Sequence, residues 1–162
     1  MGYTLSPEGV TFITTEESFE PKAYDKDGHW TIGFGHTGED VLEGHGISRD
    51  AAVALFEQDV KSVLSAIDTY VRMPLKQCQV DAITSLLFNC GPGLLGTERS
   101  LGHALVFTKT EEAVGNAILL YDMATINGVR GPFLASRRKA EHEMFNGAEE
   151  VSTPSGTFKC AK

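Results

Sequence analysis

The chain has 162 residues and a formal net charge of −8, from 22 acidic side chains against 14 Lys and Arg. Because a nucleic-acid partner calls for a basic face, this balance argues against DNA or RNA binding. Hydrophobic residues make up 41% of the chain and charged residues 22%, an ordinary composition for one globular domain. No stretch reaches the roughly 18 to 20 continuous apolar residues of a membrane span, so we expect no spanning helix.

The first residues, MGYTLSPEGVTFITTEE, lack the basic region, apolar region and cleavage site of a secretory signal. We therefore expect the protein to stay in the cytoplasm where it is made until another route releases it. The three cysteines, Cys78, Cys90 and Cys160, cannot all pair within one chain. Free thiols are usual in a reducing compartment, and we predict them here.

In chain order, the first predicted element is a helix with Ser6 as its N-cap and Pro7 at its first position. The segment KAYDKDGHWTIGFGH then places β-forming residues on both sides of a Gly-containing turn, which is typical of a hairpin. Next, Ser48 precedes a run with apolar side chains at helical spacing, and this pattern predicts a long helix.

These elements predict one α+β, mostly helical domain made of two lobes. Residues 1–47 form a small lobe of helix and hairpin, residues 48–72 form the connecting helix, and residues 73–150 form a helical lobe. The last residues, 151–162, have little to bury and are predicted to be a mobile tail. Active sites commonly lie in the cleft where two such lobes meet.

Five carboxylates lie between residues 16 and 27, where the first helix ends and the hairpin begins. Steps of three and four place Glu17 on the same helix face as Val10 and Ile13, beside apolar packing that suits a proton donor. Glu16 lies about 100° around the helix by the same periodicity. A solvated Glu17 near a fraying helix end is an equally good interpretation of the periodicity.

The length of the hairpin loop decides which residues share a face of the sheet. A two-residue loop would pair Asp25 with Trp30, whereas a three-residue loop pairs Asp25 with His29 and places it on the face of Thr31. Only the longer loop gathers the aromatic side chains on the opposite face, so we predict the longer loop. Asp27 is the alternative carboxylate if the loop is tighter.

An acid on the helix end, a carboxylate on the strand and a nearby hydroxyl form a set that is typical of hydrolysis. Glycoside hydrolysis requires two carboxyl groups, one to protonate the leaving oxygen and one to activate water or trap the sugar. The candidate catalytic residues are therefore Glu17, Asp25 and Thr31. The histidines between residues 29 and 45 match no metal-ligand spacing, so we predict structural or solvated histidines and no metal site.

Three segments in order resemble the bacteriophage-type lysozymes of glycoside hydrolase family 24, which include the T-even and lambdoid endolysins. They are EESFEPKAYDKDGHWTIGFGHT, which is similar to the family's catalytic segment, QVDAITSLLFNCGPG and GPFLASRRKAEHEMF. In the first segment the matching residues are Glu17, Ala23, Tyr24, Asp25, Gly28, Thr31, Ile32, Gly33, Gly35 and His36. The resemblance implies a lysozyme-like fold with its cleft between the two lobes.

By position, the resemblance makes Glu17 the general acid, Asp25 the carboxylate that activates water, and Thr31 the residue that helps to hold that water. It implies cleavage of the β-1,4 bond between N-acetylmuramic acid and N-acetylglucosamine in peptidoglycan, without a cofactor. The expected partner is the peptidoglycan glycan strand, and the expected state is a monomer. The expected route of release is a holin pore during phage lysis.

Two of the chain's departures from the family pattern lie close to the candidate acid. It is one residue shorter in the hairpin, so the usual spacing counted back from Asp25 reaches Glu16. Counted back from Tyr24, the spacing reaches Glu17, which we prefer, with Glu16 as the reserve. The family's Arg three residues after the catalytic Glu is Glu20 here, which removes a salt bridge that we would otherwise expect at the site.

Four further residues are predicted to border the sugar groove: Gly33, Phe34, Gln79 and Asn89. Glycine in a strand allows close approach of a ligand, although it also serves simple bends. One of Arg137 and Arg138 is expected to form a salt bridge within the helical lobe rather than to bind the wall peptide. The alternative function is a peptidoglycan-binding protein with a catalytically disabled lysozyme fold, which the shortened hairpin mildly favours.

Overall fold

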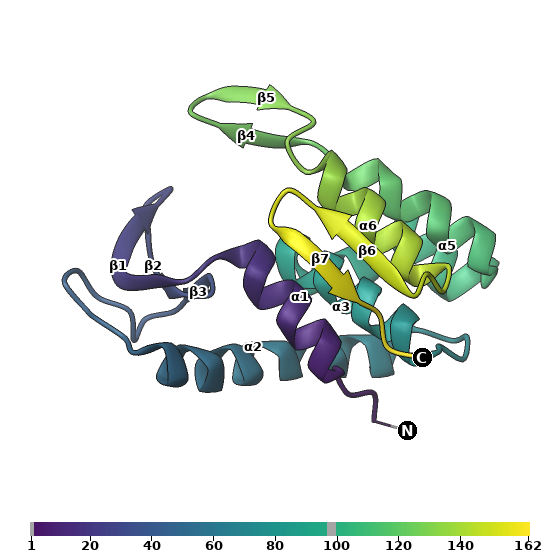
Figure 1. Ribbon diagram of the computed structural model, residues 1–162, viewed down its shortest axis with the longest axis horizontal. Helices are drawn as coiled ribbons and strands as arrows, with labels where there is room; N and C mark the ends of the chain where they lie inside the picture. Colours follow the sequence, from purple (N-terminus) through teal and green to yellow (C-terminus); the bar gives the residue numbers. More distant parts are fainter. Residues whose placement is uncertain (1, 97–99) are drawn as a thin grey trace.

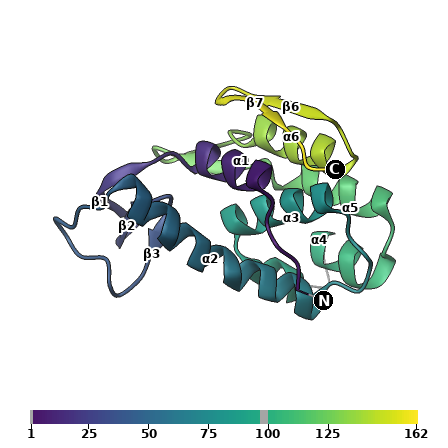
Figure 2. The ribbon, with the colours of Figure 1, turned by 60° about the horizontal axis from the view of Figure 1, so that its bottom comes forward.

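The computed structural model describes residues 2–96 and 100–162 and shows two lobes joined by one long helix (Figure 1). Helix α1 (Pro7–Glu17) leads into an antiparallel sheet in the order β1-β2-β3, with β1 Glu20–Lys26, β2 His29–Gly33 and β3 His36–Thr37. Helix α2 (Arg49–Tyr70) runs from this sheet to the second lobe, as Figure 2 also shows. The predicted α+β, mostly helical, two-lobed architecture is confirmed.

The second lobe is mostly helical and contains two further hairpins. Its helices are α3 (Gln77–Cys90), η1 (Pro92–Gly96), α4 (Ser100–His103), η2 (Ala104–Thr108), α5 (Glu111–Ile118), η3 (Leu119–Tyr121) and α6 (Ala135–Phe145). Its hairpins are β4–β5 (Ala124–Ile126 and Val129–Gly131) and β6–β7 (Glu150–Thr153 and Gly156–Lys159). Helices α3 and α6 pack against each other. Within the described part of the chain, no helix is long and apolar enough to cross a membrane.

Capping side chains fix where α1 and α2 begin, as the sequence predicts. The Ser6 hydroxyl accepts a hydrogen bond from the Gly9 N–H at 3.0 Å, and the Ser48 hydroxyl accepts one from the Ala51 N–H at 3.2 Å. The hydroxyl and backbone N–H of Ser6 both donate to the buried Asp81 carboxylate of α3. Burial raises the pKa of Asp81, although the hydrogen bonds from Ser6 oppose this effect. The start of α1 is thereby tied to the helical lobe.

One hydrophobic core joins α1, α2, α3 and α6. Its fully buried members include Phe12, Ile13, Phe56, Ile67, Ile83, Leu86 and Phe145. Burial of each such side chain contributes about 1.5–3 kcal/mol to the stability of the fold. This core holds the end of α1 in a constant position relative to the helical lobe.

The last residues form an ordered hairpin, so the prediction of a mobile tail for residues 151–162 is wrong. Strands β6 and β7 are antiparallel, and Val151 pairs with Phe158. Both side chains are buried, and the Phe158 ring meets the Phe12 ring edge-on with centroids 5.1 Å apart. One inward-facing apolar residue in each short strand attaches the hairpin to α1, and so short an alternation gives little signal in the sequence.

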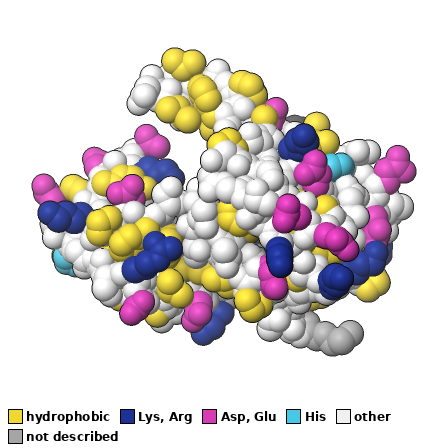
Figure 3. Space-filling model, viewed as in Figure 1, with side chains coloured by type: hydrophobic (Ala, Val, Ile, Leu, Met, Phe, Trp, Pro, Cys, Tyr) yellow, Lys and Arg dark blue, Asp and Glu magenta, His cyan; other side chains and the backbone are white. Residues whose placement is uncertain are grey.

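A second hairpin, β4–β5, is absent from the sequence-based prediction. Its turn residues Asn127 and Gly128 have φ values of 50° and 77°, and an Asn-Gly pair is a hairpin signal that should have revealed it. Ile126 pairs with Val129 at the tip, where these side chains are 50% and 61% exposed. The hairpin projects from the helical lobe in Figure 1, and apolar side chains gather on it in Figure 3.

The turn of the first hairpin is one residue tighter than predicted. Asp27 and Gly28 form a two-residue loop with φ values of 55° and 84°, the left-handed conformations of a type I′ turn. The pairs are Tyr24 with Thr31, Asp25 with Trp30, and Lys26 with His29. The predicted three-residue loop is therefore wrong, and Asp25 lies on the face opposite to that of Thr31. The local preference of Asp-Gly for a tight turn outweighs the grouping of aromatic side chains on one face.

His36 attaches the base of the sheet to α2. Its Nδ1 lies 2.8 Å from an Asp59 carboxylate oxygen, and its Nε2 lies 3.3 Å from Asp40. Burial alone lowers the pKa of His36, but the hydrogen bonds and charges of Asp59 and Asp40 outweigh burial and raise the pKa. His36 therefore has the predicted structural role. In residues 2–96 and 100–162, no three His, Cys, Asp or Glu side chains come together as possible metal ligands.

Candidate active site

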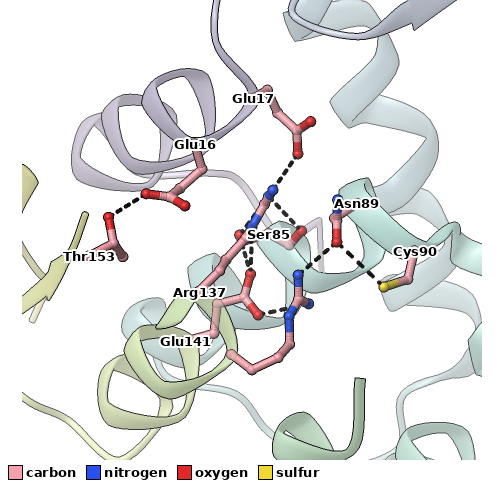
Figure 4. A network of polar contacts seen from close by, with 9 residues as sticks. Glu16, Glu17, Ser85, Asn89, Cys90, Arg137, Glu141 and Thr153 are labelled. Atoms are coloured by element: carbon pink, nitrogen blue, oxygen red, sulfur yellow. Dashed lines mark hydrogen bonds and ion pairs between the residues drawn. The ribbon is translucent and has the colours of Figure 1, made fainter. Parts of the chain in front are cut away.

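Glu17 is the last residue of α1, and its carboxylate points toward the helical lobe (Figure 4). Glu17 Oε1 accepts a hydrogen bond from Arg137 Nη1 at 2.7 Å, and the side chain is 16% exposed. The helix ends here because Ser18 has φ 61° and ψ 157°, a conformation that is almost confined to glycine. The chain turns away from the helix axis at Ser18 and leaves Glu17 at the junction of the lobes.

Arg137 of α6 is held in place by several acceptors besides Glu17. Its Nε donates to Glu141 Oε1 at 3.2 Å, and its Nη2 donates to the Ser85 backbone and hydroxyl oxygens at 3.3 and 3.2 Å. Burial alone lowers the pKa of Arg137, but the negative charges of Glu17 and Glu141 outweigh it and raise the pKa. The guanidinium therefore stays charged and fixes the orientation of the Glu17 carboxylate.

A second arginine completes the buried network. Arg138 Nη1 lies 2.9 Å from Glu141 Oε2, and Arg138 Nη2 donates to Asn89 Oδ1 at 2.7 Å. Burial raises the pKa of Glu141, while the charges of Arg138 and Arg137 oppose the rise. The predicted salt bridge within the helical lobe is confirmed, and Arg137 also crosses to Glu17. Nothing local in the sequence indicates this contact between residues 120 positions apart.

Glu16 and Glu17 point to different neighbours, as Figure 4 shows. Glu16 Oε1 accepts a hydrogen bond from the Thr153 hydroxyl of the C-terminal hairpin at 2.5 Å. Glu17 instead meets Arg137, and a Cβ added to Gly35 would lie 3.8 Å from Glu17 Oε2. Gly35 has φ 90° and was missed as a site residue, although the Gly-x-Gly pattern after the strand could have revealed it.

Thr31 and Tyr24 lie opposite each other on one face of the hairpin. Thr31 is completely buried, and its hydroxyl donates to the His29 carbonyl oxygen at 3.3 Å. Burial raises the pKa of Tyr24, and the negative charges of Glu20 and then Glu17 raise it further. The Tyr24 phenol therefore lies within electrostatic reach of the Glu17 carboxylate, which connects this face of the hairpin with the end of α1.

Asp25 and Asp27 are both exposed at the tip of the hairpin. Asp25 Oδ1 accepts a hydrogen bond from the Gly28 N–H at 2.7 Å, so the carboxylate closes the turn. Asp25 pairs with Trp30, and Asp27 occupies the first position of the tight turn. The structure thus brings neither carboxylate onto the face of Thr31.

Three of the residues predicted to border the sugar groove are buried and have structural contacts. Gly33 has φ 66°, and a Cβ there would lie 3.1 Å from the Ala52 Cβ, so glycine lets β2 pack closely on α2. Phe34 packs in a cluster of phenylalanine rings and is 2% exposed. Gln79 is completely buried, and its Oε1 accepts a hydrogen bond from the Lys76 N–H at the start of α3. Side chains buried in this way offer no surface to a sugar.

Asn89, the fourth of these residues, has a different environment. It is partly buried at the end of α3, and its Oδ1 accepts the hydrogen bond from Arg138. The same oxygen also accepts a contact from the Cys90 thiol at 3.6 Å, so both of its lone pairs are used and the amide nitrogen of Asn89 is left to donate to a ligand. Asn89 therefore stays a proposed groove residue.

Comparison with known proteins agrees with this geometry. A family model described as phage lysozyme matches residues 14–141. The endolysin of Acyrthosiphon pisum secondary endosymbiont phage 1 is 33% identical over 147 residues, which cover 89% of this chain and 99% of that protein. The endolysin of Salmonella phage P22 is 35% identical over 146 residues, which cover 87% of this chain and 97% of that protein.

Solved structures give the same result for the fold. The muramidase domain of SpmX from Asticaccaulis excentricus superposes with a TM-score of 0.77 at 29% identity, over 90% of this chain and 99% of that one. The L86M mutant of P22 lysozyme superposes with a TM-score of 0.73 at 33% identity, over 90% of this chain and 99% of that one. The two-lobed fold and the carboxylic acid at the lobe junction define a glycoside hydrolase of the lysozyme class. The chain belongs to the phage lysozyme family.

Proposed function

We propose that this protein is an endolysin, a muramidase that hydrolyses the β-1,4 bond between N-acetylmuramic acid and N-acetylglucosamine in peptidoglycan. The observation that carries the proposal is the Glu17 carboxyl group, held at the end of α1 by Arg137 and approached by the backbone of Gly35. The similarity of the chain to phage endolysins over most of its length supports bacterial cell wall as the substrate and lysis of the host as the outcome.

In the proposed reaction, Glu17 gives a proton to the glycosidic oxygen as the bond to the anomeric carbon breaks. Family resemblance gives Thr31 the role of holding the attacking water, and its hydroxyl, which donates to the His29 carbonyl oxygen, keeps the capacity to accept a hydrogen bond from that water. Family resemblance assigns the activation of this water to Asp25, whereas the hairpin register separates Asp25 from Thr31. The chemistry of acid, base and water needs no cofactor.

The test is the release of reducing sugar from purified peptidoglycan by the wild type, Glu17→Gln and the matched control Glu16→Gln. We expect Glu17→Gln to lose about 10²- to 10⁴-fold in kcat, because it removes the proton donor. Glu16→Gln should keep most of the activity, and the products should carry added water by mass. Activity of Glu17→Gln, anhydro products, or binding without cleavage by the wild type would each contradict the proposal.

We further propose that the protein acts as a monomer, binds no nucleic acid and leaves the host cytoplasm through a holin pore. The net charge of −8 supports the absence of a nucleic-acid partner. Sedimentation should give one species of the monomer mass. Expression in a bacterial host should cause lysis only when a holin is expressed with it, and lysis without a holin would contradict this route.

A further inference from the structure

The two adjacent carboxylates at the end of α1 contact different elements of the helical lobe. Glu17 Oε1 accepts a hydrogen bond from Arg137 Nη1 of α6 at 2.7 Å. Glu16 Oε1 instead accepts one from the hydroxyl of Thr153, the last residue of β6, at 2.5 Å. The carboxylates carry the same charge and lie near one cation, so separate partners keep them from competing for it.

Arg137 is the cation that both carboxylates approach. In Figure 4 its guanidinium comes between the side chains of Glu16 and Glu17. Burial alone lowers the pKa of Arg137, the charges of Glu17 and Glu141 raise it most strongly, and the charge of Glu16 raises it as well. Because the attraction between charges falls with distance, Glu16 lies close enough to Arg137 to attract the guanidinium.

Arg137 also has a hydrogen-bond donor that its present contacts leave over. An arginine side chain has five N–H groups. In the part of the chain that the structure describes, Arg137 makes one hydrogen bond to Glu17, one to Glu141 and two to Ser85. At least one N–H is therefore left for a further acceptor, and a carboxylate is a strong acceptor for a guanidinium. Glu16, next to Glu17 on α1, can be that acceptor if its own partner is removed.

The Thr153 hydroxyl is held in the position from which it donates to Glu16. Its oxygen accepts a hydrogen bond from the Ser155 N–H at 3.1 Å, within the turn of the C-terminal hairpin. A hydroxyl has one proton to donate, and Glu16 is the acceptor of that proton. The edge-on contact of Phe158 with Phe12 fixes the hairpin on α1. The hairpin therefore presents a fixed donor to Glu16.

We propose that Thr153 is a positioning residue for the catalytic acid. By holding Glu16 on the C-terminal hairpin, Thr153 leaves the contact with Arg137 to Glu17. Without this hydroxyl, Glu16 turns toward the guanidinium and competes with Glu17 for it. The Glu17 carboxyl group then loses the orientation from which it protonates the glycosidic oxygen. The inference rests on the proposed function, because it takes Glu17 as the acid.

The test measures kcat and KM on purified peptidoglycan for Thr153→Val, which removes the hydroxyl and keeps the size of the side chain. We expect kcat to fall about 10- to 100-fold with KM nearly unchanged, because the acid is displaced while substrate binding is not. Thr153→Ser keeps the hydroxyl and should stay within about threefold of the wild type. Wild-type kcat in Thr153→Val, or a rise in KM alone, would overturn the inference.

Ser152→Ala is the control within the same strand. It removes the 3.0 Å contact between the Ser152 and Thr157 hydroxyls, which does not involve Glu16 or Glu17. We expect its kcat to equal that of the wild type. A loss in Ser152→Ala as large as that in Thr153→Val would overturn the inference, since any weakening of the hairpin would then have the same effect.

The double variant Thr153→Val with Glu16→Gln separates competition for Arg137 from loss of support by the hairpin. A neutral amide at position 16 competes weakly for the guanidinium. We therefore expect the double variant to recover kcat to within about threefold of Glu16→Gln alone. A loss of kcat that persists in the double variant would overturn the inference.

Thermal unfolding establishes that each variant is folded at the assay temperature. If Thr153→Val is not folded there, Thr153→Ala takes its place, with the same expected loss of kcat and the same recovery with Glu16→Gln. The proposed function fails separately, through activity of Glu17→Gln, so the two failures are distinguishable.

Discussion

The two lobes differ in how far they bury the charged side chains near the site. The helical lobe buries Arg137, Arg138 and Glu141, which are 5%, 1% and 0% exposed. The hairpin exposes Glu20 and Asp25 to solvent. Buried charges persist only when they are paired, and pairing makes their positions rigid. The comparison teaches that one half of the site fixes the direction of the acid, while the other half leaves a carboxylate open to water and substrate.

The largest expected effect on stability comes from removing one cation of the buried network of Arg137, Arg138 and Glu141. Arg138→Ala removes one of the two cations that neutralise the completely buried Glu141. We expect the free energy of unfolding to fall by about 3–5 kcal/mol, because a buried charge loses its partner. Urea unfolding measures this loss. Lys139→Ala is the control, since its ion pair with Glu143 is long and exposed and should change stability by about 0.5 kcal/mol or less. Equal losses in the two variants would contradict the rigid network.

His36→Asn tests the contact between the sheet and α2 through its pH dependence. The pKa of His36 is raised in the folded state, so its contribution to stability is complete below the unfolded pKa of 6.5 and is lost as the pH rises through the folded-state pKa. We expect His36→Asn to lower the free energy of unfolding by about 1.5–3 kcal/mol near pH ~5.5, and by clearly less near pH ~9. A difference from the wild type that does not change between these pH values would argue against a charged contact.

One inserted residue in the β1–β2 hairpin can change the face on which Asp25 lies. A glycine inserted between Tyr24 and Asp25 would lengthen the loop and bring Asp25 onto the face of Thr31. We expect this insertion to raise kcat at least about tenfold over the wild type, which is about 1.4 kcal/mol of activation free energy. The same insertion after Gly28 is the control, because it leaves Asp25 next to Tyr24 on the other face. Equal kcat values for the two insertion variants would show that the face of Asp25 is irrelevant.

The smallest expected effect is at the boundary between the halves. Ser18 has a positive φ at the end of α1 that costs a non-glycine residue about 1–3 kcal/mol. We expect Ser18→Gly to raise the free energy of unfolding by about 1 kcal/mol, since glycine relieves the strain but gains freedom in the unfolded chain. Thermal unfolding gives the answer, and Ser18→Ala should not stabilise. Destabilisation by glycine would mean that the Ser18 conformation is unstrained.

Part of the site could be predicted from the sequence because its signals are local. Apolar residues at helical spacing placed Glu17 on the inner face of α1, and the structure gives it the partly buried position that this periodicity predicts. The hairpin was predicted in the right place, but its register was not. Asp-Gly supports a tight turn and the aromatic grouping supports a longer one, and the sequence does not show which preference is stronger.

The sequence by itself determined the first helix, the long connecting helix, the caps of both and the segment that carries the acid, because caps and periodicity act between neighbours in the chain. Tertiary structure alone decided three features. Arg137 reaches Glu17 across 120 positions, Val151 and Phe158 attach the last hairpin to α1, and the hairpin pairing places Tyr24 opposite Thr31. Each depends on packing between separate elements, and such packing leaves no periodic or local mark on the residues that take part in it.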